Sequence, residues 1–230
     1  MSSKFIIIRV LLFVLLVVGT TSAMIAQDND FTTWTKFKVN HKIDSRFAVS
    51  GNLELRTEDD MSAIDRWGIS VGGDYRAFSF LKFEIGYETH YRNLGEIGWK
   101  FRHRYRIGAT ASFRYQWLKM SLRERFQQAF DRGESETRLR SRLKLGYAPQ
   151  KGIVSPYFSI EIYQSLDDAP FWRTARLRYR PGIEIDLTKR WSLDAFYCYQ
   201  YESSRGKHIA GVEVGYSSVS YTHLTLPTIA

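Results

Sequence analysis

Apolar and polar residues alternate along most of the chain, in segments of roughly ten residues that turn-forming residues separate. Between Leu81 and Arg92, for example, Phe83 and Ile85 share one parity while Lys82 and Glu84 share the other. Because successive side chains of a β-strand point to opposite faces, this period of two predicts strands with one apolar face. Eleven segments carry the pattern: residues 31–43, 46–57, 66–76, 81–92, 99–112, 118–130, 137–147, 156–165, 173–187, 191–202 and 208–216.

The connections between these segments alternate in length. Short connections such as 44–45 and 188–190 alternate with longer polar ones such as 58–65 and 203–207. Short turns at one end and longer loops at the other are typical of outer-membrane β-barrels. The predicted fold class is therefore all-β: an antiparallel transmembrane β-barrel of about 10–12 strands with a charged lumen.

The count of eleven segments conflicts with the even number of strands that single-chain bacterial barrels have. Three explanations are open. The first segment, 31–43, is a plug; or it pairs irregularly and leaves ten regular strands; or a further short strand is present.

Aromatic residues lie near the ends of the predicted strands, on the apolar face. Two belts of Trp and Tyr around an aliphatic band suit side chains held at two water–lipid boundaries. A soluble periplasmic β-sandwich binding protein, or a soluble barrel, is the alternative, although nothing in a sandwich requires this placement. Trp67, Tyr91 and Trp99 lie next to long loops, and Tyr75, Tyr147 and Trp191 lie next to short turns.

The two ends of the chain differ from the repeating part. Residues 1–26 have a basic start, an apolar run over 10–18 and small residues before Ala23, which is the pattern of a secretory signal peptide. Cleavage after Ala23 and cleavage after Ala26 fit this pattern equally. Residues 219–230 end the alternation and resemble translated sequencing-adapter read-through, so we expect a non-native tail there. The barrel is thus predicted over residues 27–218.

Composition excludes several classes of protein. The chain of 230 residues is 44% hydrophobic, 15% aromatic and 25% charged, which excludes a disordered tail and a bundle of membrane helices. Its net charge of +9 would allow a nucleic-acid partner, but we expect none for an exported protein. The one cysteine, Cys198, excludes a disulfide framework and a Cys-based zinc site, and we expect neither a cofactor nor a metal.

Assigning the apolar face to lipid places the polar face in the lumen, because Lys or Arg at the bilayer midplane costs about 2–4 kcal/mol. Ten basic residues on three consecutive strands then form a strongly positive wall, and three more follow on a later strand. The ten are Lys100, Arg102, Arg104, Arg106, Arg123, Arg125, Arg138, Arg140, Arg142 and Lys144, and the three are Arg176, Arg178 and Arg180. The acidic residues expected in the same lumen include Glu84, Glu88, Glu161, Asp194 and Glu202.

Such a lumen suits two functions. Interleaved Arg and carboxylate side chains can fill and rigidify a narrow barrel, which makes a structural protein. Alternatively, a basic wall lowers the barrier for phosphate or carboxylate solutes, which makes a narrow, anion-preferring, porin-like channel. In neither case is the protein expected to be an enzyme.

An enzymatic alternative depends on three residues that interrupt the apolar face, His103, Glu124 and Ser141, joined by Gln128. A lipid or lipid-A deacylase acting at the outer leaflet would need a Ser nucleophile, a His base and a carboxylate facing the membrane. Hairpin arithmetic places His103 opposite Gln128. It places Ser141 opposite Phe126 and leaves Glu124 away from His103. We therefore favour a structural role for these side chains, either bonding one another or at a belt or oligomer contact.

Seven short blocks carry a family resemblance: Trp34-Thr35, Glu54-Leu55-Arg56, Asp65-Arg66-Trp67, Arg102-His103-Arg104, Ser121-Leu122-Arg123-Glu124-Arg125, residues 138–144 and residues 211–216. With these blocks the chain resembles an uncharacterised outer-membrane family, domain-of-unknown-function family 2490, over nearly all of residues 31–216. The resemblance implies a Gram-negative outer-membrane β-barrel with a signal peptide and no assigned activity. We expect outer-membrane lipid as a partner, and the barrel-assembly machinery during insertion, while the oligomeric state is left open.

Overall fold

The computed structural model describes residues 30–131, 133–147, 149, 152–167, 172–202 and 205–220. The predicted signal peptide and residues 221–230 of the predicted tail lie outside the described residues. Val219 is still part of the last strand, and the Ser220 N–H donates to the Lys42 carbonyl at 3.0 Å. The described barrel therefore extends two residues past the predicted boundary at 218.

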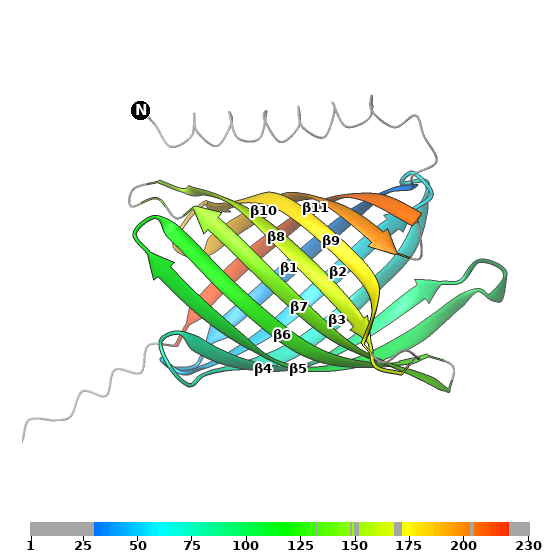
Figure 1. Ribbon diagram of the computed structural model, residues 1–230, viewed down its shortest axis with the longest axis horizontal. Coiled ribbons are helices and arrows are strands. Elements are labelled where there is room, and N and C mark those ends of the chain that lie inside the picture. The colour runs from blue at the N-terminus through cyan, green and yellow to red at the C-terminus, as the bar shows by residue number, and fades with distance from the viewer. Residues whose placement is uncertain are drawn as a thin grey trace, which may run out of the picture.

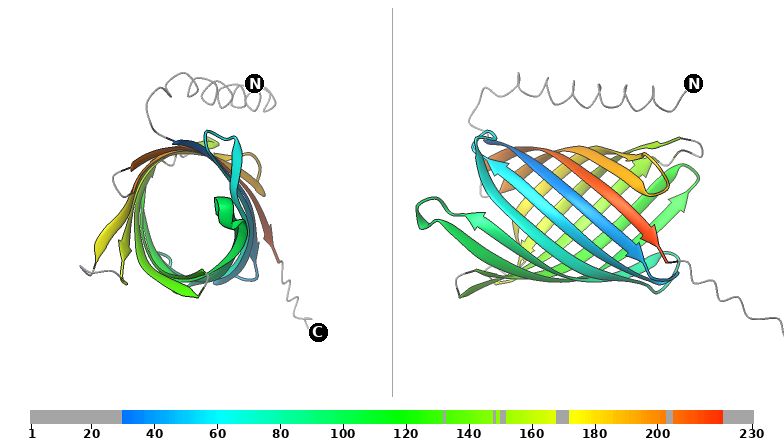
Figure 2. Two further views of the ribbon diagram at one scale, coloured as in Figure 1. Left: turned by 90° about the vertical axis from the view of Figure 1, so that its right-hand side faces the viewer. Right: turned by 180° about the vertical axis from the view of Figure 1, so that it is seen from behind.

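Eleven strands form one closed barrel, as Figure 1 shows from the side and Figure 2 along its axis. Each strand is hydrogen-bonded to its neighbours in chain order, and β1 closes the ring against β11. The strands are β1 (Asp30–Lys42), β2 (Phe47–Glu58), β3 (Ala63–Arg76), β4 (Leu81–Asn93), β5 (Trp99–Tyr115), β6 (Leu118–Asp131), β7 (Glu134–Tyr147), β8 (Val154–Ser165), β9 (Arg173–Asp186), β10 (Trp191–Glu202) and β11 (Arg205–Val219), with a 3₁₀ turn η1 (Gly95–Ile97) between β4 and β5. The predicted closed barrel of ten to twelve strands is confirmed, and the sandwich alternative is wrong.

The odd number of strands requires one parallel pair, β1 with β11, which we call the parallel seam. Ten of the strand pairs are antiparallel, but β1 and β11 run parallel, from Asp30 opposite Lys207 to Lys42 opposite Val219. Strands that alternate in direction around a ring must bring two of the same direction together when their number is odd. The suggestion that 31–43 is a plug is wrong, because β1 pairs on both sides and forms part of the wall.

The alternation seen in the sequence separates the two surfaces of the barrel. Apolar side chains of one parity face outward and stay exposed in the isolated chain, for example Leu53 at 53%, Val71 at 56% and Ile85 at 64%. A ring whose backbone groups are all paired and whose outer surface is apolar is the form that a barrel takes in a bilayer. Among the described residues, no helix has the length and apolar character to span a membrane.

The aromatic residues expected as belts form ring contacts at both ends of the strands. Near the long loops, Trp67 and Trp99 flank Tyr91, with ring centroids 5.7 and 5.1 Å apart. Near the short turns, the Trp191 ring lies 4.9 Å from that of Tyr216. The remaining two expected residues have ring partners as well: Tyr75 with Phe47 and Tyr147 with Trp117. The structure thus places each of them in an aromatic cluster near a strand end, at one rim or the other.

Candidate functional site

The candidate site is the lumen, where inward side chains of every strand meet. The strongly positive wall expected from the sequence is largely paired, because carboxylates of the lumen lie within ion-pair distance of most of its members. Arg104 and Arg106 share Glu88, Arg125 contacts Glu84, and Arg102 and Arg138 share Glu136. Lys144 contacts Glu184, and Arg176 contacts Glu202. Of the thirteen basic residues expected in the lumen, Lys100 has no carboxylate within ion-pair distance in the described part of the chain, and it is exposed.

Glu161 on β8 is the centre of the largest ion cluster. Its side chain is only 2% exposed, and both of its oxygens accept hydrogen bonds from Arg140 Nη2, at 2.8 and 2.7 Å. Three further guanidinium groups lie farther away: those of Arg142 at 3.4 Å, Arg178 at 3.6 Å and Arg123 at 3.9 Å. One carboxylate therefore faces four guanidinium groups drawn from β6, β7 and β9.

A second cluster surrounds Arg180 on β9. Its Nη2 donates to Asp194 at 2.7 Å and to Glu213 at 3.0 Å, and its Nε donates to the Tyr157 hydroxyl at 2.9 Å. Arg180 is only 8% exposed, and its Cζ lies 3.4 Å from the centre of the Phe196 ring. Here two carboxylates serve one arginine, the reverse of the ratio at Glu161.

Apolar side chains complete the filling on this side of the lumen. Phe196, Cys198 and Ile209 form a buried cluster against which Trp34 packs, with the Trp34 and Phe196 rings meeting edge to face. The Arg178 guanidinium lies 4.7 Å over the Trp34 ring. We call this side of the lumen the packed wall; it is formed by Trp34, Glu161, Tyr163, Arg178, Arg180, Phe196, Cys198, Ile209 and Gly211. Cys198 is a small, buried side chain that fills space in this cluster.

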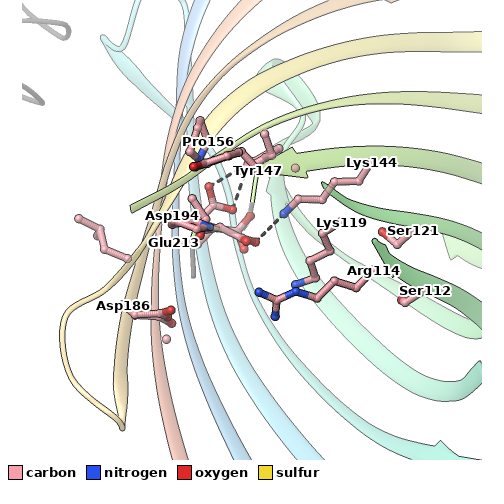
Figure 3. A pocket seen from close by; sticks show the side chains of 18 of the residues that line it. Ser112, Arg114, Lys119, Ser121, Lys144, Tyr147, Pro156, Asp186, Asp194 and Glu213 are labelled. Atoms are coloured by element: carbon pink, nitrogen blue, oxygen red, sulfur yellow. Dashed lines mark hydrogen bonds and ion pairs between the residues drawn. The ribbon is translucent and has the colours of Figure 1, made fainter. Parts of the chain in front are cut away.

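The described residues line two cavities in the rest of the lumen. The larger, which we call the vestibule, has a volume of about 930 Å³ and lies at the short-turn end. Figure 3 shows its basic side chains Arg114, Lys119 and Lys144 opposite the acidic Asp194 and Glu213. The smaller, which we call the inner cavity, has a volume of about 220 Å³. The two share Lys38, Ser121 and Lys144 in their linings, so the inner cavity adjoins the vestibule.

The lining of the inner cavity is mostly cationic. Its described residues include seven basic side chains and two acidic ones. The basic residues are Lys38, Lys82, Arg106, Arg123, Arg125, Arg142 and Lys144, and the acidic residues are Asp74 and Glu84. Basic side chains therefore outnumber acidic ones in the lining of the inner cavity by seven to two.

Sequence reasoning missed Lys38 and Lys82 as residues of this cavity. Both have the inward parity of their strands, which was the available signal. It also missed the buried His90, whose Nε2 lies 3.6 Å from Glu54.

The predicted catalytic residues do not come together. His103 lies opposite Phe130, not Gln128, and its Nδ1 is hydrogen-bonded to the Tyr87 hydroxyl at 2.6 Å. Ser141 lies opposite Glu124, not Phe126, and its Oγ donates to Glu124 Oε2 at 2.6 Å.

Both predicted registers were wrong by two residues, which preserves the face of every side chain but changes its partner. Glu124 lies opposite Ala109, six residues along β5 from His103. At about 3.3 Å per residue this separation is roughly 20 Å, far beyond hydrogen-bonding reach. The structure therefore contains a Ser–Glu pair on the outer face but no triad. In the described ranges, moreover, no group of three or more His, Cys, Asp or Glu side chains is placed to hold a metal ion.

The fold and the lumen define the class: a closed β-barrel with an apolar outer surface and a charged interior. Within that class, the chain belongs to the family described as "Protein of unknown function (DUF2490)", whose family model matches residues 31–209. Among solved structures, the chain is similar to "NanC porin structure in rhombohedral crystal form", with a TM-score of 0.48 and 12% identity over 76% of this chain and 91% of that one. No curated protein matches the chain.

Proposed function

We propose that this protein is a narrow, anion-preferring channel of the Gram-negative outer membrane. The observation that carries the proposal is the inner cavity, where seven basic side chains face two acidic ones inside a closed barrel. Positive charge inside a low-dielectric wall lowers the barrier for anions and raises it for cations.

The location in the outer membrane is supported by three features. The barrel exposes an apolar surface, aromatic side chains cluster near both strand ends, and residues 1–26 have the sequence pattern of a signal peptide. Barrels reach the outer membrane through the periplasm, so export and this surface belong together.

A structural role is the second candidate, and the packed wall favours it. Glu161, Arg178 and Arg180 are buried and fully engaged with partners from other strands, so this side of the lumen is filled rather than open. A barrel filled in this way would scaffold the membrane without passing solutes. The two candidates differ in one measurable property, which is ionic conductance.

Planar-bilayer recordings of the refolded full chain test the proposal. We expect small single-channel steps and a reversal potential on the anion-selective side in a salt gradient. The double variant Arg123→Gln, Arg142→Gln should move the reversal potential toward zero, because both side chains line the inner cavity. Arg46→Gln is the matched control, since Arg46 lies exposed in the β1–β2 turn. A complete lack of conductance would instead support the structural role.

A further inference from the structure

The cations of the inner cavity are unequally neutralised. Four of the seven have a carboxylate close by: Arg125 has Glu84, Lys82 has Asp74, Arg106 has Glu88, and Lys144 has Glu184. The other three are Lys38, Arg123 and Arg142. Among the described residues no carboxylate lies within ion-pair distance of Lys38, although it lines both cavities. The positive charge of the cavity is therefore least balanced where these three side chains meet it.

Arg123 and Arg142 share a single carboxylate, that of Glu161, with two other arginines. Both oxygens of Glu161 already accept hydrogen bonds from Arg140, and Arg178 lies close by as well. The contacts left for Arg142 and Arg123, at 3.4 and 3.9 Å, are ion pairs without hydrogen-bond geometry. The charge of these two guanidinium groups is therefore only partly balanced by the carboxylates of the described residues.

We propose that the inner cavity holds a binding site for a phosphate-type oxyanion, formed by Lys38, Arg123 and Arg142. A tetrahedral dianion offers the charge and the several acceptor oxygens that two guanidinium groups and one ammonium lack here. A volume of about 220 Å³ accommodates such an ion with part of its hydration. Chloride has a single charge and no oxygen geometry to match, so the site discriminates between anions.

The route to the site is through the vestibule. Lys38 and Lys144 line both cavities, so an anion that enters at the short-turn end meets cationic side chains before it reaches Arg123 and Arg142. The site deepens the channel proposed above, because it adds a binding step to the anion preference. Its occupancy, however, does not require that the lumen conducts from end to end.

Isothermal titration calorimetry tests the site directly, with the refolded full chain in alkyl maltoside micelles and inorganic phosphate as the titrant. We expect saturable binding of one phosphate per chain that excess chloride weakens only through ionic strength. Glycerol phosphate in a parallel titration distinguishes a free phosphate from a phosphate monoester, such as a lipid headgroup carries. Tighter binding of inorganic phosphate is expected in the enclosed cavity, and tighter binding of the monoester would overturn the assignment to a free ion.

The variants Lys38→Gln and Arg123→Gln should each weaken phosphate binding about tenfold, the effect of one charged hydrogen bond. Arg114→Gln is the matched control. It removes the same charge, but Arg114 lines the vestibule and not the inner cavity. Lys38→Gln should also leave folding unchanged, because Lys38 forms no ion pair with the described carboxylates. Heat-modifiable migration on gels verifies that each variant is folded. Equal weakening by all three variants, or no saturable phosphate binding, would overturn the proposal.

The calorimetric and electrical results separate the two proposals. Anion selectivity without phosphate binding leaves the channel and removes the site. Phosphate binding without conductance leaves the site and removes the channel.

Discussion

The two sides of the lumen are built from the same alternation of apolar and polar residues, but one side is filled with side chains and the other contains the two described cavities. In the packed wall, inward side chains are almost completely covered: Tyr163 is 4% exposed, Cys198 1% and Ile209 0%. Around the vestibule and the inner cavity, inward side chains stay partly accessible, such as Arg123 at 19%. The difference is in partners, because the packed wall combines aromatic and apolar side chains with its charges, whereas the inner cavity is lined mainly by cations.

This contrast suggests that stability and solute contact are divided between the two sides. A fully paired and covered charge resists change, since removing its partner strands a buried ion. A partly solvated charge tolerates change and can exchange its partner for a solute. Substitutions on the packed wall should therefore reduce stability, and substitutions around the cavities should mainly alter anion handling.

The largest effect is expected from Glu161→Gln on the packed wall. The change keeps the shape but leaves four guanidinium groups around an uncharged amide. Breaking a buried ion pair in this way typically costs about 3–5 kcal/mol. Urea unfolding of the barrel in lipid vesicles measures the loss. A change below about 1 kcal/mol would mean that the packed wall is as solvated as the cavities.

A smaller loss is expected from Gly211→Ala, also on the packed wall. A Cβ at Gly211 would lie 2.0 Å from the nearest atom of the Phe196 ring, so the ring must move out of its contact with Trp34. Overpacking of this kind costs about 1–3 kcal/mol. The matched control is Gly51→Ala, where the nearest atom to the added carbon is 3.9 Å away. Equal urea midpoints for the two variants would contradict the close packing described here.

On the open side, Glu184→Gln should cost little. Its carboxylate pairs with Lys144 but is 40% exposed, and Lys144 keeps its contact with the Tyr157 ring at 3.7 Å. Exposed pairs contribute about 0–1 kcal/mol, so we expect a loss in that range in the same unfolding assay. This change is chemically identical to Glu161→Gln, and the ratio of the two losses measures the contrast between the two sides. A loss as large as that of Glu161→Gln would erase the contrast.

The smallest effect is expected outside the lumen, at Asp44 in the β1–β2 turn. Its Oδ1 accepts the backbone N–H groups of Phe47 and Arg46, both at 2.7 Å, which lowers the pKa of the carboxyl group. Because the folded pKa is depressed, the stability that Asp44 adds is present above the unfolded pKa of about 3.9 and is lost as the pH falls through the folded value. Asp44→Asn should therefore lower the urea midpoint slightly at neutral pH, and the difference should vanish at the acid end of the titration. A difference that is independent of pH would contradict this explanation.

The pattern of the sequence predicted which residues face outward and which face the lumen, because that depends on parity alone. It did not predict which residues lie opposite each other, because a shift of two residues preserves parity. The β5–β6 hairpin shows this: β5 continues to Tyr115, which pairs with Leu118, and Gln116 takes a positive φ of 50° in the tight turn. The predicted pairing of His103 with Gln128 implies a turn one residue earlier in the chain, which displaces every partner in this hairpin by two.

The candidate site was predictable only in part for a related reason. The sequence showed which charged residues point inward. Which arginine or lysine pairs with which carboxylate, however, depends on the tilt of the strands and on the path of each side chain. Glu161 was expected in the lumen, yet its position among four arginines arises from contacts across β6, β7, β8 and β9.

The parallel seam determines that the two ends of the barrel wall lie at opposite rims of the barrel. β1 begins at the rim of the long loops, and β11 ends at the rim of the short turns, as the two strands run side by side in Figure 2. Epitopes inserted next to Asp30 and next to Val219 should consequently report opposite compartments in intact cells. A circularly permuted barrel would need a linker as long as the wall is tall, whereas in an even-stranded barrel a short turn suffices.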